Sequence, residues 1–217
     1  MTWLGVDWTP ERLRICQVRV TPGFLFVAAL LLYQSTPSFL VTFLLAAALH
    51  EGGHLLAARW RGVPVRALSM TAFGCVLDFA DGALVRDRDL LCIAAAGPLC
   101  NLLCALLCVT PWVGQWHGAA LFAAEHLLLA LFNLLPVFPL DGAVLCAGLL
   151  RPKLGERRAE QVVLVLSGGL GLAAVGTALW WGGDAGMRFL LLAGWVGGNF
   201  LQKVLPCPCH SRRFPVK

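Results

Sequence analysis

Long apolar runs, separated by short polar or glycine- and proline-containing segments, dominate the pattern along the chain. A helix needs about 20 mainly apolar residues to cross the hydrocarbon core of a bilayer, so runs of this length predict membrane spans. Six segments fit, the first being the shortest: 22–35, 37–58, 90–110, 118–135, 161–181 and 187–205. We therefore predict an all-α polytopic membrane protein with about six transmembrane helices.

The composition supports this prediction. Hydrophobic residues make up 59% of the 217 residues, charged residues 13%, and the mean hydropathy is +0.76, which is far more apolar than a soluble domain. No cleavable signal peptide is expected, because the chain opens with Trp3, Asp7, Trp8 and Glu11 instead of a basic stretch before an apolar one.

The basic residues predict the orientation. With the N-terminus in the cytoplasm, Arg188 is the one residue among the 17 lysines and arginines that falls outside, a strong positive-inside bias. Both termini are then cytoplasmic, with a lead-in at 1–21, a six-span membrane domain at 22–205 whose core is 37–150, and a tail at 206–217. Lipid and topology account for the net charge of +5, and no nucleic-acid partner is expected, because no basic stretch is interleaved with aromatics.

The second predicted span carries the motif HExxH, formed by His50, Glu51 and His54. Residues i and i+4 share one face of a helix, so the two imidazoles can bind one Zn²⁺ while Glu51 acts as a general base toward water. The alternative is a chance match with buried histidines that only find hydrogen-bond partners. Ionisable groups are expensive to bury in a membrane, which favours the metal site.

A catalytic zinc site needs a third protein ligand and an open fourth position for water. The fourth span ends in a stretch broken by two prolines, Asn133-Leu134-Leu135-Pro136-Val137-Phe138-Pro139-Leu140-Asp141-Gly142. Irregular backbone at membrane depth lines a protein-enclosed or water-filled cavity, so Asp141 is the natural third ligand. Its alternative role is the N-cap of a helix that starts at Gly142.

Further polar residues lie inside the predicted spans. Asn101, with Gly97 and Pro98, is expected at a close helix crossing with an interhelical hydrogen bond. Glu125 and His126 are expected to support polar packing or line a water path, because His126 lies about two helical turns from Asn133, some 10 Å, too far to join Asp141 as a ligand. Most cysteines in the spans read as small hydrophobes, and a second metal site in the tail at Cys207, Cys209 and His210 would lack a fourth ligand.

Three motifs in this order resemble a known family. The HExxH motif, Ala96-Gly97-Pro98-Leu99-Cys100-Asn101 (AGPxxN) and the NxxPxxPLDG stretch ending at Gly142 are similar to those of the site-2 proteases, intramembrane zinc metalloproteases of the M50 class. The resemblance covers residues 39–150. It implies one Zn²⁺ per chain held by His50, His54 and Asp141, Glu51 as catalytic base, and substrate positioning by Asn133 and Pro139. It also implies a bacterial cell membrane and a membrane-tethered or membrane-adjacent protein substrate cut near the cytoplasmic face.

Within the family, the layout looks most like the stage IV sporulation protease branch, which cleaves a sigma-factor precursor at the forespore membrane. That branch commonly carries a cytoplasmic nucleotide-sensing (CBS) domain, whereas this chain ends about a dozen residues past its last predicted span. We also consider an inhibitory membrane partner. Alternatives are a housekeeping site-2 protease acting on anti-sigma factors or signal-peptide remnants, and a non-catalytic membrane scaffold. Gly52 stands where the family usually has a bulky apolar residue, which predicts a looser helix at the ligands.

Two segments next to the spans show strand-like patterns. Residues 63–81 contain short strand-like runs on either side of Gly74. In the family, the matching segment is a β-hairpin that dips into the membrane and could offer an edge strand to an unwound substrate. An ordinary cytoplasmic loop is the alternative. Residues 12–20 are expected to form either a strand at the membrane edge or an amphipathic lead-in.

Overall fold

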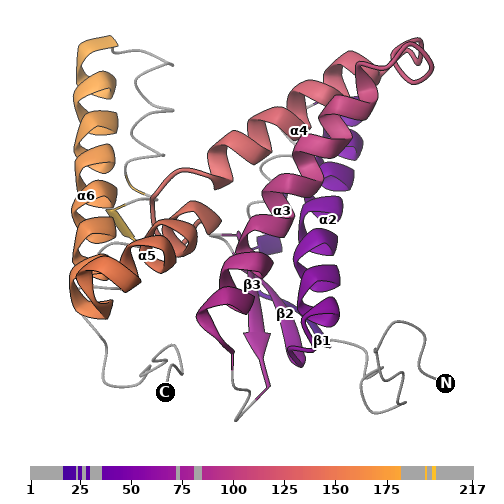
Figure 1. Cartoon of the computed structure of the whole chain (residues 1–217). Helices are drawn as coiled ribbons and strands as arrows, with labels where there is room; N and C mark the ends of the chain where they lie inside the picture. The colour runs from indigo at the N-terminus through magenta and orange to yellow at the C-terminus, as the bar shows by residue number, and fades with distance from the viewer. Residues whose placement is uncertain are drawn as a thin grey trace, which may run out of the picture. The chain divides into compact units, whose positions relative to one another are not determined.

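The computed structural model describes residues 17–22, 24–25, 28–29, 36–71, 74–80, 85–181, 194 and 197–198 (Figure 1). The chain divides into two compact units, Met1–Ala130 with Pro215–Lys217, and Leu131–Phe214. Each unit is described by itself. The predicted tail site at Cys207, Cys209 and His210 lies outside the described residues.

Two long helices form the frame of the first unit: α2, Pro37–Trp60, and α3, Asp87–Cys108. Helix α2 begins where the hydroxyl of Thr36 accepts a hydrogen bond from the backbone of Phe39 at 3.4 Å, with proline at the first helical position. Helix α3 begins with Asp87 and Asp89 in its first turn, where carboxylates favour the positive end of the helix dipole.

The two helices run side by side (Figure 1). Small side chains let them approach closely: a Cβ added at Gly53 would lie 2.8 Å from the backbone oxygen of Ala96. A cluster of Ala57, Ala58, Val63 and Ile93 closes their polar end, where Arg61 donates to the buried carboxylate of Asp89 at 2.6 Å. The ends of α2 and α3 are therefore fixed to one another by packing and by an ion pair.

A three-stranded sheet connects to these helices. Its strands are β1, Gln17–Val20, β2, Val65–Thr71, and β3, Gly74–Phe79, in the order β1-β2-β3. Strand β1 pairs with β2 in parallel and β2 pairs with β3 in antiparallel register, with the Ser69 hydroxyl donating to Asp78 at 3.0 Å. The hairpin predicted at 63–81 is confirmed, so the loop alternative is wrong for that segment. In the lead-in, residues 17–20 form a strand, the first of the two expectations for 12–20.

Helix α4, Ala119–Asn133, has 15 residues and begins in the first unit. Inside that unit it is tied to α2 by the hydroxyl of Thr42, which donates to the buried carboxylate of Glu125 at 2.9 Å. The fourth predicted span, 118–135, is thus a helix shorter than the roughly 20 residues of a full crossing.

Three described helices are long and apolar enough to cross a membrane, at Pro37–Trp60, Asp87–Cys108 and Glu156–Trp180. They correspond to the second, third and fifth predicted spans. The first and sixth predicted spans, 22–35 and 187–205, lie mostly outside the described residues. The described part of the chain therefore contains three candidate membrane spans and one shorter apolar helix.

The second unit contains α5, Asp141–Leu154, and α6, Glu156–Trp181, which pack through Ala143, Ala147 and Val163. Gly155, at φ 77, separates them in a conformation that favours glycine. The hydroxyl of Ser167 accepts a bond from the backbone of Phe138 at 3.2 Å and fixes the proline-rich turn before α5 onto α6. Helix α5 was expected only as part of the alternative role of Asp141, which placed a helix start at Gly142.

Candidate metal centre

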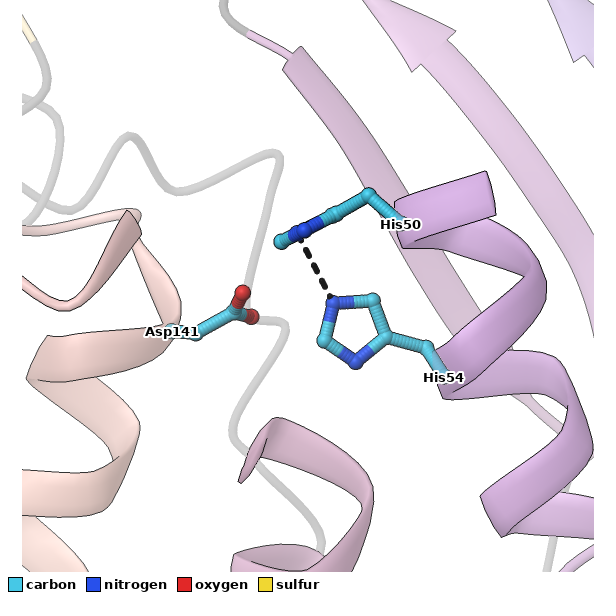
Figure 2. A group of neighbouring side chains, drawn as sticks. All are labelled: His50, His54 and Asp141. Carbon is cyan, nitrogen blue, oxygen red and sulfur yellow. Dashed lines mark hydrogen bonds between the residues drawn. The ribbon is translucent and has the colours of Figure 1, made fainter. Parts of the chain in front are cut away.

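The two histidines of the HExxH motif lie on successive turns of α2 and face one another (Figure 2). His50 is 4% and His54 5% exposed, and their Nε2 atoms are 3.2 Å apart. Two imidazoles bound to one tetrahedral Zn²⁺ at about 2.05 Å place their nitrogens about 3.3 Å apart. The two rings therefore stand at the separation that a shared zinc ion requires.

The far side of the His54 ring is fixed by the neighbouring helix. Its Nδ1 lies 2.7 Å from the backbone oxygen of Ile93 in α3, and a carbonyl can only accept, so this Nδ1 carries the proton and donates. The proton on Nδ1 leaves the lone pair of Nε2 for a metal, the arrangement that ligating histidines adopt.

Gly97 of α3 forms the wall opposite the two imidazoles. A Cβ at this position would lie 2.2 Å from Nε2 of His54 and 2.9 Å from Cε1 of His50. Any side chain larger than hydrogen would displace the ring nitrogens that face a metal. The glycine of the AGPxxN motif is therefore required by the geometry of the histidine pair.

Glu51 follows His50 in α2 and contacts the start of strand β3. The thiol of Cys75 in β3 donates a hydrogen bond to its carboxylate. Burial raises the pKa of Cys75 from 9.0 to about 12, and the negative charge of Glu51 and their hydrogen bond add to the effect. Strand β3 thus begins beside the predicted base.

Sequence reasoning did not single out Cys75. The motif and the hairpin were both visible in the sequence, but neither gives the register that brings Cys75 to Glu51. The backbone carbonyl of Ile93 was also missed, since a backbone partner leaves no trace in residue identity. The other described cysteines are free, in agreement with their reading as small hydrophobes.

Asp141 is the first residue of α5. The N-cap is Leu140 and no side chain caps this helix, so the alternative role of Asp141 as an N-cap is wrong. A Cβ at the next residue, Gly142, would lie 2.2 Å from the backbone oxygen of Leu134, which explains the glycine in the PLDG sequence. The turn and the helix start together set the position of the Asp141 carboxylate within the second unit.

Figure 2 draws the three side chains that can each offer one ligand atom to a metal ion, the imidazole nitrogens of His50 and His54 and a carboxylate oxygen of Asp141. Two neutral imidazoles and one carboxylate are a donor set typical of catalytic zinc. The chemistry of these donors fits Zn²⁺, and the separation of the two histidine nitrogens also matches that of two imidazoles bound to one zinc ion.

The remaining predicted site residues have defined places. Asn133 is the last residue of α4, and Pro139 follows a cis peptide bond in the turn before α5. Their roles in substrate positioning stay predictions. Asn101 lies fully buried between His50 and His126, so the interhelical hydrogen bond predicted for it is present, and it reaches a predicted zinc ligand.

Comparisons with known proteins agree with these features. Residues 38–117 match the family model of Peptidase family M50. The chain is 32% identical over 168 residues to "Putative zinc metalloprotease Rip3" of Mycobacterium tuberculosis strains Erdman and H37Rv, an alignment that covers 67% of this chain. It spans only 40% of the length of these relatives.

A solved structure shares the fold. The "Site-2 Protease from Methanocaldococcus jannaschii" superposes with a TM-score of 0.67 at 20% sequence identity, over 89% of this chain and 93% of that chain. At this level of identity the likeness concerns the fold alone.

Proposed function

We infer from the M50 match and the ordered motifs that the chain is a member of peptidase family M50, the site-2 proteases, and we propose that it is a zinc-dependent intramembrane endopeptidase. One observation carries the proposal. The Nε2 atoms of His50 and His54 lie 3.2 Å apart, with Glu51 between them in sequence, on a helix apolar enough to cross a membrane. Buried ionisable groups on such a helix serve a function by default.

The proposed reaction is hydrolysis of a peptide bond. Zinc, when bound, supplies a Lewis acid that acidifies water and polarises the scissile carbonyl. Glu51 takes a proton from the attacking water as the new C–O bond forms, and then delivers it to the nitrogen of the leaving amine as the C–N bond breaks. His50 and His54 offer nitrogen ligands, and Gly97 leaves the space in front of them open.

Asp141 is proposed as the third ligand. It is a half-buried carboxylate that does not cap its own helix, and a carboxylate together with two imidazoles is a donor set typical of catalytic zinc. Zinc content of purified Asp141→Ala protein tests this assignment: loss of zinc relative to wild type supports it, and equal zinc in both removes it.

The hairpin suggests the class of substrate. Strand β3 is at an edge of the described sheet and begins beside Glu51, where Cys75 contacts the carboxylate. An extended peptide can add to such an edge and recover the backbone hydrogen bonds that a helix loses on unwinding. We therefore propose a membrane-tethered or membrane-adjacent protein segment, cut near the cytoplasmic face.

A sigma-factor precursor in sporulation is the finer proposal, and it rests on the resemblance to the stage IV branch. Cleavage of anti-sigma factors or signal-peptide remnants remains the enzymatic alternative. The scaffold alternative is disfavoured by the intact set of Glu51, both histidines and Asp141, since a chain that only keeps the fold does not need all four.

The test is a comparison of new protein N-termini by mass spectrometry in native cells that carry wild type, Glu51→Gln or His54→Ala, sampled through starvation. Glu51→Gln should retain zinc but lose cleavage, because removal of a general base typically lowers the rate by about 10²–10⁴-fold. His54→Ala should lose both.

A substrate processed only by wild type supports the protease and identifies what it cuts. A sigma-factor pro-sequence among the new N-termini supports the sporulation branch. Equal processing in all three strains, with each protein present in the membrane, contradicts the proposal and favours the scaffold.

A further inference from the structure

We propose that Asn101 is a positioning residue that sets the rotation and the tautomer of the zinc ligand His50, and that His126 in turn holds Asn101. The inference rests on the zinc site proposed above. It goes beyond that proposal because it assigns a role to two residues that neither bind the metal nor touch the substrate.

A continuous row of polar side chains crosses three helices at this point. Asn101 in α3 places its amide nitrogen 3.2 Å from Nδ1 of His50 in α2, and its amide oxygen 3.1 Å from Nδ1 of His126 in α4. Asn101 and His126 are both 0% exposed, so bulk solvent does not reach either side chain. The Asn101 amide therefore lies directly against Nδ1 of His50.

The chemistry of the imidazole decides which end of that amide must face His50. Ligation through Nε2 leaves the proton on Nδ1, and an N–H requires an acceptor opposite it. Asn101 supplies that acceptor when a half turn of its amide brings the oxygen to His50 and the NH₂ to Nδ1 of His126. The two ends of the amide occupy nearly the same space, so the half turn needs no movement of the helices.

His126 is suited to hold the amide in that orientation. The ring is packed edge-on against Phe122, one turn earlier in α4, with centroids 4.3 Å apart and an interplanar angle of 82°. Its Nδ1 accepts from an amide NH₂ when the ring proton is on Nε2, a buried nitrogen without a hydrogen-bond partner among the described residues. Among the described residues, the hydrogen bond that holds the ring of His126 is the one between its Nδ1 and Asn101.

A purely structural role for Asn101 makes a different prediction. If the side chain only fills space between α2 and α3, leucine should replace it well and aspartate poorly, because a buried charge is costly. If it orients His50, aspartate should replace it well, because a carboxylate accepts from Nδ1–H, and leucine should fail. The two substitutions therefore separate the roles.

The experiment measures zinc affinity of the full chain, purified in detergent, by competition with a chelator. Wild type, Asn101→Leu, Asn101→Asp and His54→Ala are compared. Loss of a hydrogen-bond partner of a zinc-bound histidine typically weakens metal binding by about 10–100-fold, and we expect this loss in Asn101→Leu. Asn101→Asp should remain close to wild type.

The outcomes are distinct. Wild-type affinity in Asn101→Leu, or a larger loss in Asn101→Asp than in Asn101→Leu, overturns the inference while the zinc site stands. A wild type that binds zinc no better than His54→Ala overturns the proposed function itself.

A second measurement on zinc-loaded wild type avoids any effect of the substitutions on folding. The chain has five histidines, few enough for assignment by ¹⁵N NMR of histidine-labelled protein. We expect His50 protonated at Nδ1 and His126 protonated at Nε2 with a bare Nδ1. A proton on Nδ1 of His126 would mean that the amide oxygen faces His126, and the inference would be wrong.

Discussion

At the scale of single residues, the space in front of the histidine pair depends on a missing side chain. A Cβ at Gly97 would lie 2.2 Å from Nε2 of His54, the atom that faces a metal. Gly97→Ala is therefore expected to lower zinc affinity by at least about 100-fold, the upper range seen when the surroundings of a ligand are altered. The measurement is zinc retained after dialysis against a chelator.

The matched control is Gly52→Ala, two residues from His50 and His54. A Cβ at Gly52 meets nothing within 4 Å, so the substitution should leave zinc binding unchanged. It should also raise the stability of α2 by about 1 kcal/mol, because alanine is the better helix former. Zinc retained equally by both alanine variants would show that Gly97 does not determine the site.

Cys75 gives a pH-dependent prediction. Its pKa is raised from 9.0 to about 12 in the folded chain, so folding favours the neutral thiol. The stabilising contribution is fully present below pH 9 and is lost as the pH rises from 9 to about 12. At pH 9, alkylation of Cys75 should be slower by at least about a hundredfold in the folded chain than in the unfolded one, because the thiolate is the reactive form.

Peptide-resolved mass spectrometry after timed alkylation measures this rate for Cys75 alone. Glu51→Gln is the matched variant: it removes the carboxylate charge and leaves the burial, which is the largest cause, so the pKa should fall only part of the way. Equal alkylation rates in folded and unfolded wild type would contradict the burial of Cys75, and equal rates in folded wild type and folded Glu51→Gln would contradict its contact with Glu51.

The sequence predicted the residues whose chemistry depends on local spacing. His50 and His54 follow from the i, i+4 repeat, and Asn101 and His126 were recognised as buried polar residues without a named partner. Ile93 and Cys75 were not predicted, because their contacts depend on how α3 and β3 pack against α2. Residue identity specifies which side chains can bind a metal or accept a proton, whereas tertiary packing specifies which groups contact those side chains.

At the scale of elements, the turn between α4 and α5 depends on Gly142. A Cβ there would lie 2.2 Å from the backbone oxygen of Leu134, and backbone cannot yield as a flexible side chain can. Gly142→Ala should shift the start of α5, which carries Asp141, and destabilise the chain by about 1–3 kcal/mol, the usual range for overpacking. Thermal unfolding and zinc content measure the two effects.

Gly169 in α6 provides the control for this element. A Cβ at Gly169 meets nothing within 4 Å, so Gly169→Ala should raise stability slightly and leave zinc content unchanged. A Gly142→Ala protein that unfolds and binds zinc like wild type would mean that the turn tolerates a side chain.

The elements were predictable to different degrees. Strands β2 and β3 were predictable from the strand-like sequence on either side of Gly74, because the period of two of a strand can be recognised within a few adjacent residues. A strand at β1, which precedes α2 by more than a dozen residues, was only one of two expectations, and its pairing with β2 was not predicted. Helix α5 was expected only through the alternative role of Asp141, since its 14 residues are too short for a span and carry Arg151, Pro152 and Lys153 at its end.

At the scale of the whole molecule, apolar length predicted α2, α3 and α6 because a bilayer sets the length of a crossing helix. Length alone did not predict that α4 stops at 15 residues. The apolar run continues past Asn133, the last residue of α4, into a turn with two prolines. Proline disfavours the continuation of a helix, so the apolar run is longer than the helix.

The orientation in the membrane provides the last prediction. Arg59, Arg61, Arg86 and Arg88 all lie at the joined ends of α2 and α3, whereas residues 111–118 between α3 and α4 contain no lysine or arginine. The positive-inside rule predicts that the arginine end, with the hairpin, faces the cytoplasm. Pro64→Cys and Gln115→Cys, both at exposed positions, test this with a membrane-impermeant maleimide read by peptide-resolved mass spectrometry. In intact cells or right-side-out vesicles only Cys at 115 should be labelled, and in inverted vesicles only Cys at 64. The reverse pattern would place the base Glu51 and β3 toward the outer face, and a cytoplasmic substrate could not then be cut.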